Sequence, residues 1–382
     1  MALTFLTTGC WDRVEINNRG FVVGVSVDAQ PAKEDEDKST ARSFRICYQI
    51  VIPGAQKGGT EGGKASSGYS NLCGEAVSLS AFNQFAADKL SRPPFYDHLK
   101  VIIISDRVAR VGSGFSDSLD FFLRGTGLRR SIKILVAKGD ASQALNSESP
   151  NEKLPATDIE NISGNRRSLE KPPASHIGYI HERLMNETSF AVQQLETQNK
   201  SILVSGSAVF DGRTNREAGT LDARQTAGRN FLLGSKMRGF ITFQSDGIRV
   251  ALDVYEIRSH MRANVRDPEH IVFDVSVHAR VSIRETTGAQ DLMNTSVMNR
   301  IQSDAADEIE SMIADAVDKI QHDIRKDALG LGDYLKKNHY HTWKKISNDW
   351  DRGKYMLGGC IVKPQVKVSV LQMGIVDKSE RG

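Results

Sequence analysis

The chain has 382 residues, of which 39% are hydrophobic and 25% are charged, and its formal net charge is +3. This length allows two or three domains with substantial cores, and the near balance of 50 basic and 47 acidic residues lacks the concentrated basic character of nucleic-acid-binding proteins. Beyond residue 10, no segment approaches the roughly 20 consecutive apolar residues that a membrane-spanning helix needs. These properties exclude nucleic acid as an expected partner and restrict membrane association to the N-terminus or to a partner protein.

Residues 1–10 have the pattern of a lipoprotein signal that ends at Cys10. Thr8 and Gly9 supply the small side chains that signal cleavage needs, and the thiol after them could receive a diacylglyceryl group. Residues 1–9 contain no Lys or Arg and their apolar run is short, so we expect the signal to be truncated, with a basic stretch upstream of the recorded start. Taken without its context, the pattern also fits an ordinary cysteine.

Between residues 11 and 145, β-branched apolar runs alternate with segments of helical periodicity. The predicted elements are strands at 21–28, 43–52, 98–105 and 132–137 and helices at 75–90 and 116–124. The charged run 33–38 is expected at a solvated hairpin tip, and the Gly-rich segment 53–69 is expected as a long loop. Alternating strands and helices predict an α/β layer.

Residues 146–175 are polar and contain four prolines, which predicts an interdomain linker. The elements predicted after it are helices at 177–198, 296–329 and 333–352 and strands at 202–210, 239–244, 248–258, 271–284 and 361–370. In the strand at 271–284, Val275, Val277, Ala279, Val281 and Ile283 share one face. The long helix at 296–329 has apolar residues three and four apart, so we expect it to lie across a sheet.

These patterns together predict a multi-domain protein of the mixed α/β or α+β class, in which each domain is a mixed sheet flanked by helices. The expected organisation is a signal at 1–10, an N-terminal α/β domain at 11–145, a linker at 146–175, a middle domain at 176–245, a C-terminal α/β domain with the long helix at 246–372, and a tail at 373–382.

The chain has four cysteines, which are few for a disulfide-rich secreted protein. If Cys10 carries lipid, Cys47, Cys73 and Cys360 can form at most one internal pair. Cys47 falls in a predicted strand and Cys73 in a predicted loop, so separate reduced thiols are favoured over a bond.

The motifs of catalysis, cofactor binding and metal binding are incomplete. Residues 58–64 match a phosphate-binding loop through Lys64, but Ala65 follows where Ser or Thr should hold Mg²⁺. The histidines His176, His181, His339 and His341 lack the spacing of metal ligands, and Ser205-Gly206-Ser207 lacks the nucleophile-elbow pattern. We therefore expect no enzyme, no cofactor and no metal.

Several motifs, taken in order, resemble the Ger(x)C family, the lipoprotein C subunits of nutrient germinant receptors in bacterial spores. They are Gly9-Cys10-Trp11-Asp12, Glu15-Ile16-Asn17, the runs 98–104, 120–124, Arg129-Arg130, 136–141, 206–210 and 219–222, the segment 327–332, Trp343, Trp350 and the closing strand. Thr7 in the signal and Leu331, where an aromatic residue is common, depart from the family pattern.

The resemblance implies a three-domain mixed α/β body that is anchored through a diacylglyceryl group on Cys10. It further implies a location on the outer face of the spore inner membrane, with two membrane-embedded partners, the A and B receptor subunits, and a non-enzymatic role in the germination response. Two alternatives stay open at this point. The first is an envelope lipoprotein that binds a small solute directly, and the second is a nucleotide-hydrolysing enzyme that depends on residues 58–64.

Overall fold

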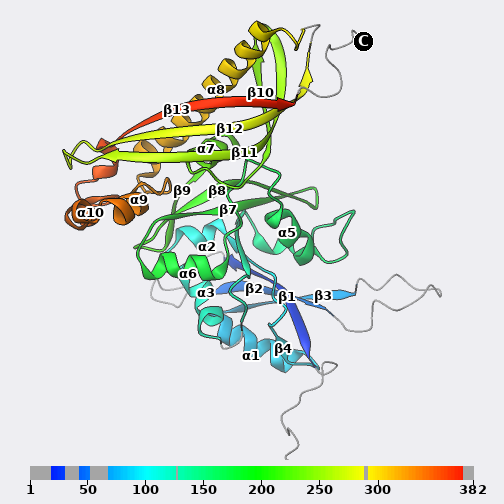
Figure 1. Ribbon diagram of the computed structural model, residues 1–382. Coiled ribbons are helices and arrows are strands. Elements are labelled where there is room, and N and C mark those ends of the chain that lie inside the picture. The colour runs from blue at the N-terminus through cyan, green and yellow to red at the C-terminus, as the bar shows by residue number, and fades with distance from the viewer. Residues whose placement is uncertain (1–18, 31–42, 52–67, 126–127, 288–290, 373–382) are drawn as a thin grey trace, which may run out of the picture.

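The computed structural model describes residues 19–30, 43–51, 68–125, 128–287 and 291–372. Within these ranges the chain forms two mixed β-sheets, one of nine strands and one of four, and helices pack on both (Figure 1). The mixed α/β fold class with helix-flanked sheets is confirmed.

The first sheet has a parallel centre and antiparallel edges. Its strands are β1 (Gly20–Ala29), β2 (Phe44–Val51), β3 (Tyr69–Ala76), β4 (Pro94–Phe95), β5 (Val101–Ser105), β6 (Lys133–Lys138), β7 (Phe190–Gln198), β8 (Ser201–Asp211) and β9 (Arg216–Leu221). Their order is β3-β2-β1-β5-β6-β7-β8-β9, with β4 beside β1. Strands β1, β5, β6 and β7 run parallel, and every residue of β5 is buried. A strand covered on both faces needs a continuous apolar run, which is what β5 supplies.

Helices cover both faces of this sheet. They are α1 (Leu79–Lys89), α2 (Asp106–Arg110), α3 (Gly114–Arg124), α4 (Ala141–Ala144), α5 (Pro155–Gly164) and α6 (Ile177–Met185). Phe82, Phe115 and Ile180 bring α1, α3 and α6 into one core on one face. Ala144 and Ile159 bring α4 and α5 into a separate core on the other face.

The segment predicted as a linker, 146–175, is folded, and that prediction is wrong for its central part. Helix α5 lies within it, with Ala156 and Ile159 fully buried against the first sheet. Pro155 is the first residue of this helix, a position where proline is favoured because its missing N–H has no partner to lose.

The helix predicted at 177–198 is also corrected. Helix α6 ends at Met185, and β7 begins at Phe190 and pairs with β6 and β8. Strands β7, β8 and β9 of the expected middle domain 176–245 therefore extend the first sheet, whereas β10 belongs to the second. The helix predicted at 75–90 starts later than expected, because strand β3 continues to Ala76 and α1 starts at Leu79.

Cys47 and Cys73 form a disulfide, so the expectation of separate reduced thiols is wrong for this pair. The two residues lie directly opposite each other on β2 and β3. Cys73 lies in a strand and not in a loop, and this pairing brings the two side chains together. Cys360 is a buried free thiol.

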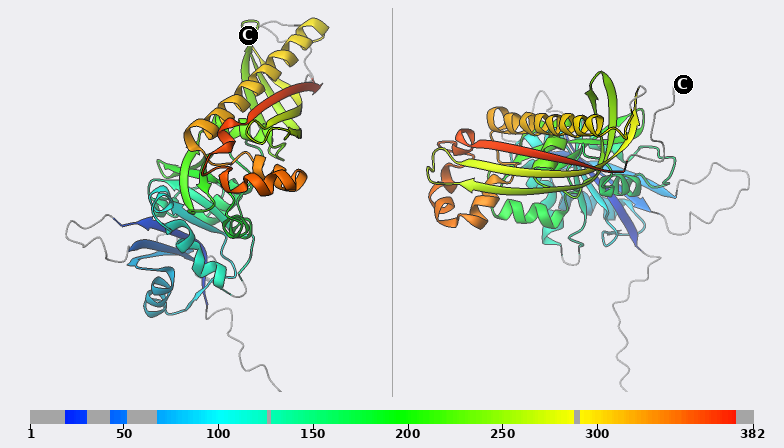
Figure 2. Two further views of the ribbon diagram at one scale, coloured as in Figure 1. Left: turned by 90° about the vertical axis from the view of Figure 1, so that its left-hand side faces the viewer. Right: turned by 45° about the horizontal axis from the view of Figure 1, so that its top comes forward.

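The second sheet has helices on one face only (Figure 2). Its strands are β10 (Gly239–Ser245), β11 (Ile248–Asn264), β12 (Val272–Thr286) and β13 (Ile361–Gln372), in that order. The five residues predicted to share a face of β12 are buried against α7 (Ala223–Leu232) and α8 (Thr295–Asp318). Helix α8 buries Ile301, Ala305, Ile309 and Ile313 there, so the prediction that the long helix lies across a sheet is confirmed.

The long helix ends earlier than predicted. A π-helical segment (Lys319–Ile324) follows α8, and Arg325 ends it by adopting a left-handed backbone with φ 59°. The predicted helix at 333–352 consists of α9 (Leu331–Asn338), α10 (Tyr340–Ile346) and a short 3₁₀ turn (Ser347–Asp349).

Helix α7 joins the two sheets through one continuous core. Phe231 and Leu232 share a buried cluster with Val209 and Leu221 of the first sheet and with strands of the second. The helix crosses α8 closely, because a Cβ on Gly228 would lie 1.9 Å from the backbone oxygen of Met312. Backbones this close require glycine at the crossing.

Candidate functional site at the junction of the two sheets

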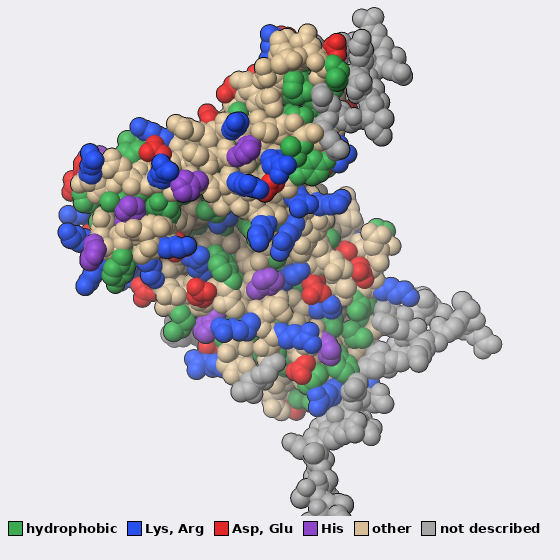
Figure 3. Space-filling model, viewed as in Figure 1, with side chains coloured by type: hydrophobic (Ala, Val, Ile, Leu, Met, Phe, Trp, Pro, Cys, Tyr) green, Lys and Arg blue, Asp and Glu red, His purple; other side chains and the backbone are tan. Residues whose placement is uncertain are grey.

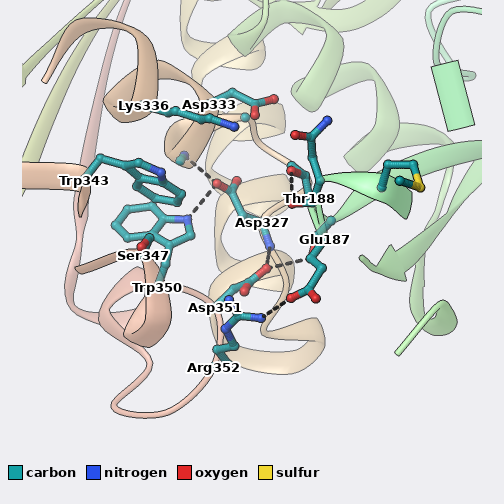
Figure 4. A pocket seen from close by; sticks show the side chains of 15 residues that line it. Glu187, Thr188, Asp327, Asp333, Lys336, Trp343, Ser347, Trp350, Asp351 and Arg352 are labelled. Carbon is teal, nitrogen blue, oxygen red and sulfur yellow. Dashed lines mark hydrogen bonds and ion pairs between the residues drawn. The ribbon is translucent and has the colours of Figure 1, made fainter. Parts of the chain in front are cut away.

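The segment that follows the π-helical turn is organised around the buried carboxylate of Asp327. Its Oδ1 accepts the backbone N–H groups of Leu329 (3.1 Å) and Leu331 (3.3 Å). Its Oδ2 accepts the N–H of Gly332 (2.6 Å) and the indole N–H of Trp350 (2.8 Å; Figure 4). One carboxylate thereby fixes the start of α9 and the ring of Trp350 to the same point.

Burial raises the pKa of Asp327, while the hydrogen bonds from Gly332 and Trp350 act in the opposite direction. The residue is 7% exposed, and its oxygens are already engaged by N–H donors. Asp327 therefore suits a positioning role. A Cβ on Gly332 would lie 2.8 Å from Nε1 of Trp350 and 2.9 Å from the ring of Trp343, so the ring packing requires glycine there.

A cavity of about 420 Å³ opens beside this cluster. Residues 185–189, which connect α6 to β7, form one wall, and side chains from 327–352 form the other (Figure 4). Trp343, Lys336 and Ser347 face it together with the carboxylates of Glu187 and Asp333. The lining mixes an aromatic ring with groups of both charges, which suits a small polar or zwitterionic molecule better than an apolar one.

Polar contacts cross the junction on several sides of this cavity. Arg183 of α6 pairs with Asp333 of α9, and Arg352 pairs with Glu187 at 3.3 Å. The hydroxyl of Ser189 donates to Asp351 at 2.6 Å. Lys326 pairs with Asp211 of the first sheet at 3.1 Å and donates to the backbone oxygen of Asp351 at 2.8 Å. The junction is thus a hydrogen-bonded interface as well as a hydrophobic one.

The other candidates lie apart from this junction or outside the described ranges. Cys10, residues 33–38 and the loop 58–65 fall outside the described residues. His176 immediately precedes α6, with Nδ1 2.9 Å from the backbone oxygen of Ser131, and His181 lies on α6.

His339 lies between α9 and α10, and His341 lies on α10. Ser205–Ser207 lies in β8, where the hydroxyl of Ser207 is 3.0 Å from that of Thr226. Within the part of the chain that the structure describes, no three His, Cys, Asp or Glu side chains gather in a way that could hold a metal ion.

The junction is only partly predictable from the sequence. The segment 327–332, Trp343 and Trp350 were grouped through the family resemblance, and the structure brings them into one cluster. Arg183, Ser189 and Asp351 carried no signal, because they complete the site only once α6 and β7 are placed beside α9. None of the helices in the described ranges is both long and apolar enough to span a bilayer.

Comparison with known proteins shows that both halves of the chain match models of spore germination protein domains. Residues 12–197 match the model of the spore germination protein N-terminal domain. Residues 205–374 match the model described as spore germination B3/GerAC like, C-terminal.

Individual relatives cover nearly the whole chain. Spore germination protein YndF of Bacillus subtilis (strain 168) is 27% identical over 91% of this chain and 90% of its own length. Spore germination protein B3 of the same organism is 21% identical over 97% of this chain and 95% of its own length. The crystal structure of the GerBC protein superposes with a TM-score of 0.61 at 19% identity, covering 92% of this chain and 99% of that one. At this identity, the structural match shows a common fold.

Proposed function

This chain belongs to the GerAC-like family of spore germination proteins, and on that premise we propose that it is the lipid-anchored C subunit of a nutrient germinant receptor. The observation that carries the proposal is the order and extent of the two family matches, which follow one another across residues 12–197 and 205–374. We further propose that the subunit is not an enzyme and is required for the germination response.

The proposed anchor is a diacylglyceryl group on Cys10. One acyl chain gives only marginal membrane binding, whereas two give durable attachment, since each buried methylene adds about 0.8 kcal/mol. The start of β1 and the second sheet lie at opposite ends of the molecule (Figures 1 and 2). An anchor at Cys10 would hold the first sheet nearer to the bilayer and direct the second sheet away from it.

The proposed location is the outer face of the spore inner membrane, and the proposed partners are the membrane-embedded A and B receptor subunits. The names of the relatives support this assignment, since proteins called spore germination protein A3 and B3 match 91% and 97% of this chain. In such a complex the junction around Asp327 would hold the two sheets at a fixed angle.

A deletion strain complemented with variants tests the proposal. The native gene, expressed from its true start, should restore germination on at least one nutrient, and Cys10→Ser should restore it poorly. Cys360→Ser is the matched control, because serine can keep the hydrogen bond that Cys360 donates to the backbone oxygen of Met356. Unchanged germination of the deletion strain on every nutrient, in the absence of a paralogue, would contradict the proposal.

A second candidate function is direct binding of a small solute, and the cavity at the junction favours it. Calorimetry of the purified chain with amino acids and sugars tests this candidate. Saturable heat that Trp343→Ala removes would support solute binding. Absence of heat with every solute would leave the receptor-subunit role as the sole proposal.

A further inference from the structure

The second sheet exposes one whole face to solvent, and this face is rich in positive charge. The inner side chains of β11 and β12 are buried under α7 and α8, while the outer ones alternate with them along each strand. Figure 3 looks onto the outer face and shows Lys, Arg and His side chains over β11 to β13.

Strand register defines the set of residues on this face, because residues directly opposite each other point to the same side. Four successive rows run from β11 through β12 to β13. We name them the basic sheet face: Arg262, Asp274, Lys363; His260, Ser276, Gln365; Arg258, His278, Lys367; and Glu256, Arg280, Ser369. It holds five Arg or Lys residues, two histidines and two carboxylates.

Asp274 lies directly opposite Arg262 and Lys363, and two of the five cations form ion pairs within the described chain. Glu256 is shared by two of them, Arg258 (2.7 Å) and Arg280 (3.1 Å). Arg262, Lys363 and Lys367 are exposed and form no ion pair with the rest of the described chain.

Some exposed cations elsewhere in the described chain have a carboxylate partner. Arg107 pairs with Asp140, and Lys319 pairs with Asp323. Other exposed lysines, such as Lys337, Lys344 and Lys345 on α9 and α10, form no ion pair within the described chain, so what distinguishes the basic sheet face is that its unpaired cations share one flat sheet surface.

The arrangement carries a cost for the isolated protein. In the row Arg258–His278–Lys367, two permanent cations flank a histidine across adjacent strands. The two cations lie on β11 and β13, two strands apart, so their mutual repulsion is modest, and Arg258 also pairs with Glu256. A ligand that supplies negative charge would convert this repulsion into attraction.

We propose that the basic sheet face binds an acidic segment of a partner polypeptide, which lies along strands β11 to β13. On β11, Arg258 and Arg262 are four residues apart, as are Lys363 and Lys367 on β13, so each pair spans about 13 Å along its strand. The two pairs are two strands apart, or about 10 Å. A carboxylate-bearing helix or extended chain fits between them.

The chemistry of the face favours a polypeptide over a bilayer surface. The side chains between the cations are polar, such as Ser276, Gln365 and Ser369. The large exposed apolar residues near it are single side chains, Ile361 and Leu371 at the two ends of β13 and Phe240 on β10, and they form no continuous apolar surface with the cations. Stable insertion into a bilayer needs an apolar surface next to the charges.

A partner strand is not expected to pair with the edge of the sheet at β13. The edge of β13 is occupied by α8, because Glu310 and Gln302 accept the backbone N–H groups of Val366 and Val370. At β13, therefore, the face and not the edge is the available surface. This inference goes beyond the proposed function and does not depend on lipid attachment.

The test measures binding of two anionic probes to the full chain. The first is a fluorescent poly-L-glutamate peptide, and the second is a vesicle of phosphatidylglycerol and phosphatidylcholine. The peptide should bind, and its Kd should rise about tenfold in the triple variant Arg262→Gln, Lys363→Gln, Lys367→Gln, since the principal unpaired cations are removed. Raising the salt concentration should weaken binding to the native chain more than to the variant.

The matched control removes three other exposed lysines, in Lys337→Gln, Lys344→Gln, Lys345→Gln on α9 and α10. It should change the Kd for the peptide less than about twofold, because these lysines lie outside the basic sheet face.

Equal weakening in both triple variants would show a general charge effect and overturn the proposal. Absence of peptide binding would also overturn it. Vesicle binding that the first triple variant removes, without peptide binding, would assign the face to a bilayer instead. Circular dichroism checks that both variants remain folded.

Discussion

The two sheets of this protein differ in how their faces are used. The first is covered by helices on both sides, and the residues of its central strand β5 are buried throughout. The second is covered by α7 and α8 on one side only, and its other side carries the basic sheet face. Charged groups are also arranged differently, since Glu217 of the first sheet pairs with Arg110 and Asp28 accepts the backbone N–H groups of Ala141 and Ser142, whereas several cations of the second sheet form no ion pair within the described chain.

The comparison distinguishes two groups of residues. The first sheet and the junction form a packed framework, and the basic sheet face is an exposed surface. Residues at the first sheet and the junction should control stability, because each has packing or hydrogen bonds to lose. Residues of the basic sheet face should leave stability nearly unchanged and affect association with a partner. Each of the following variants challenges this division.

The largest effect is expected for Asp327→Ala. Four N–H groups, including the indole of the buried Trp350, would lose their acceptor. The free energy of unfolding should fall by about 3 to 5 kcal/mol, or the chain should fail to fold. Urea unfolding followed by tryptophan fluorescence measures the change. Asp333→Ala, which removes a half-exposed partner of Arg183, is the control and should cost about 1 kcal/mol or less. Similar losses in the two variants would contradict the central role of Asp327.

The next effect is expected at the crossing of α7 and α8. In Gly228→Ala the new methyl group would meet the backbone of Met312, so the helices must move apart. Thermal unfolding should show a destabilisation of about 2 to 3 kcal/mol from overpacking. A melting temperature equal to that of the native protein would mean that α7 is not fixed between the sheets.

A pH dependence is expected from Lys171, which is 3% exposed in the segment between α5 and α6. Burial and, to a smaller extent, the charge of Lys133 lower the pKa of Lys171 to about 8 in the folded chain. Between pH 8 and the ordinary lysine pKa of 10.5, the unfolded chain binds more protons, so stability should rise with pH in this window.

Lys171→Met removes that proton uptake. The difference in unfolding free energy between the native chain and this variant should change by about 2 to 3 kcal/mol across the window. Urea unfolding at a series of pH values provides the measurement. Parallel curves for the two proteins would show that Lys171 is not held in a buried site.

The smallest effect is expected for Lys367→Gln on the basic sheet face. Removal of one like charge from its row should change the free energy of unfolding by less than about 0.5 kcal/mol, in the stabilising direction if at all. Urea unfolding at low salt is the measurement. A loss comparable to that of Gly228→Ala would place Lys367 in the framework and remove the distinction between the two sheets.

The sequence predicted the elements whose side chains follow a simple period. The face shared by Val275 to Ile283 and the apolar stripe of α8 were both predicted and are both present. These patterns are reliable because a single apolar face is buried against one neighbour.

The sequence failed where burial involves polar residues or where long-range pairing decides the structure. Strand β7 contains the buried Gln193 and Gln194, which break the apolar pattern and made a helix plausible. Pro155 was interpreted as part of a linker but begins α5. The Cys47–Cys73 bond depends on the pairing of β2 with β3, and β3 was not predicted.

The junction was predictable only in part for the same reason. Asp327, Gly332 and Trp350 are among the residues that carry the family resemblance, but the junction also includes residues as far away in sequence as Arg183, which pairs with Asp333. Unpaired cations of the basic sheet face were not visible in a chain whose net charge is only +3. Their clustering follows from strand register, which composition does not reveal.

The most direct test of the proposed function is metabolic labelling with a radioactive fatty acid in cells that process lipoproteins. The native chain, expressed from its true start, should incorporate label and fractionate with membranes, whereas Cys10→Ser should do neither. Recovery of the native mature chain without label and free of membranes would contradict the account.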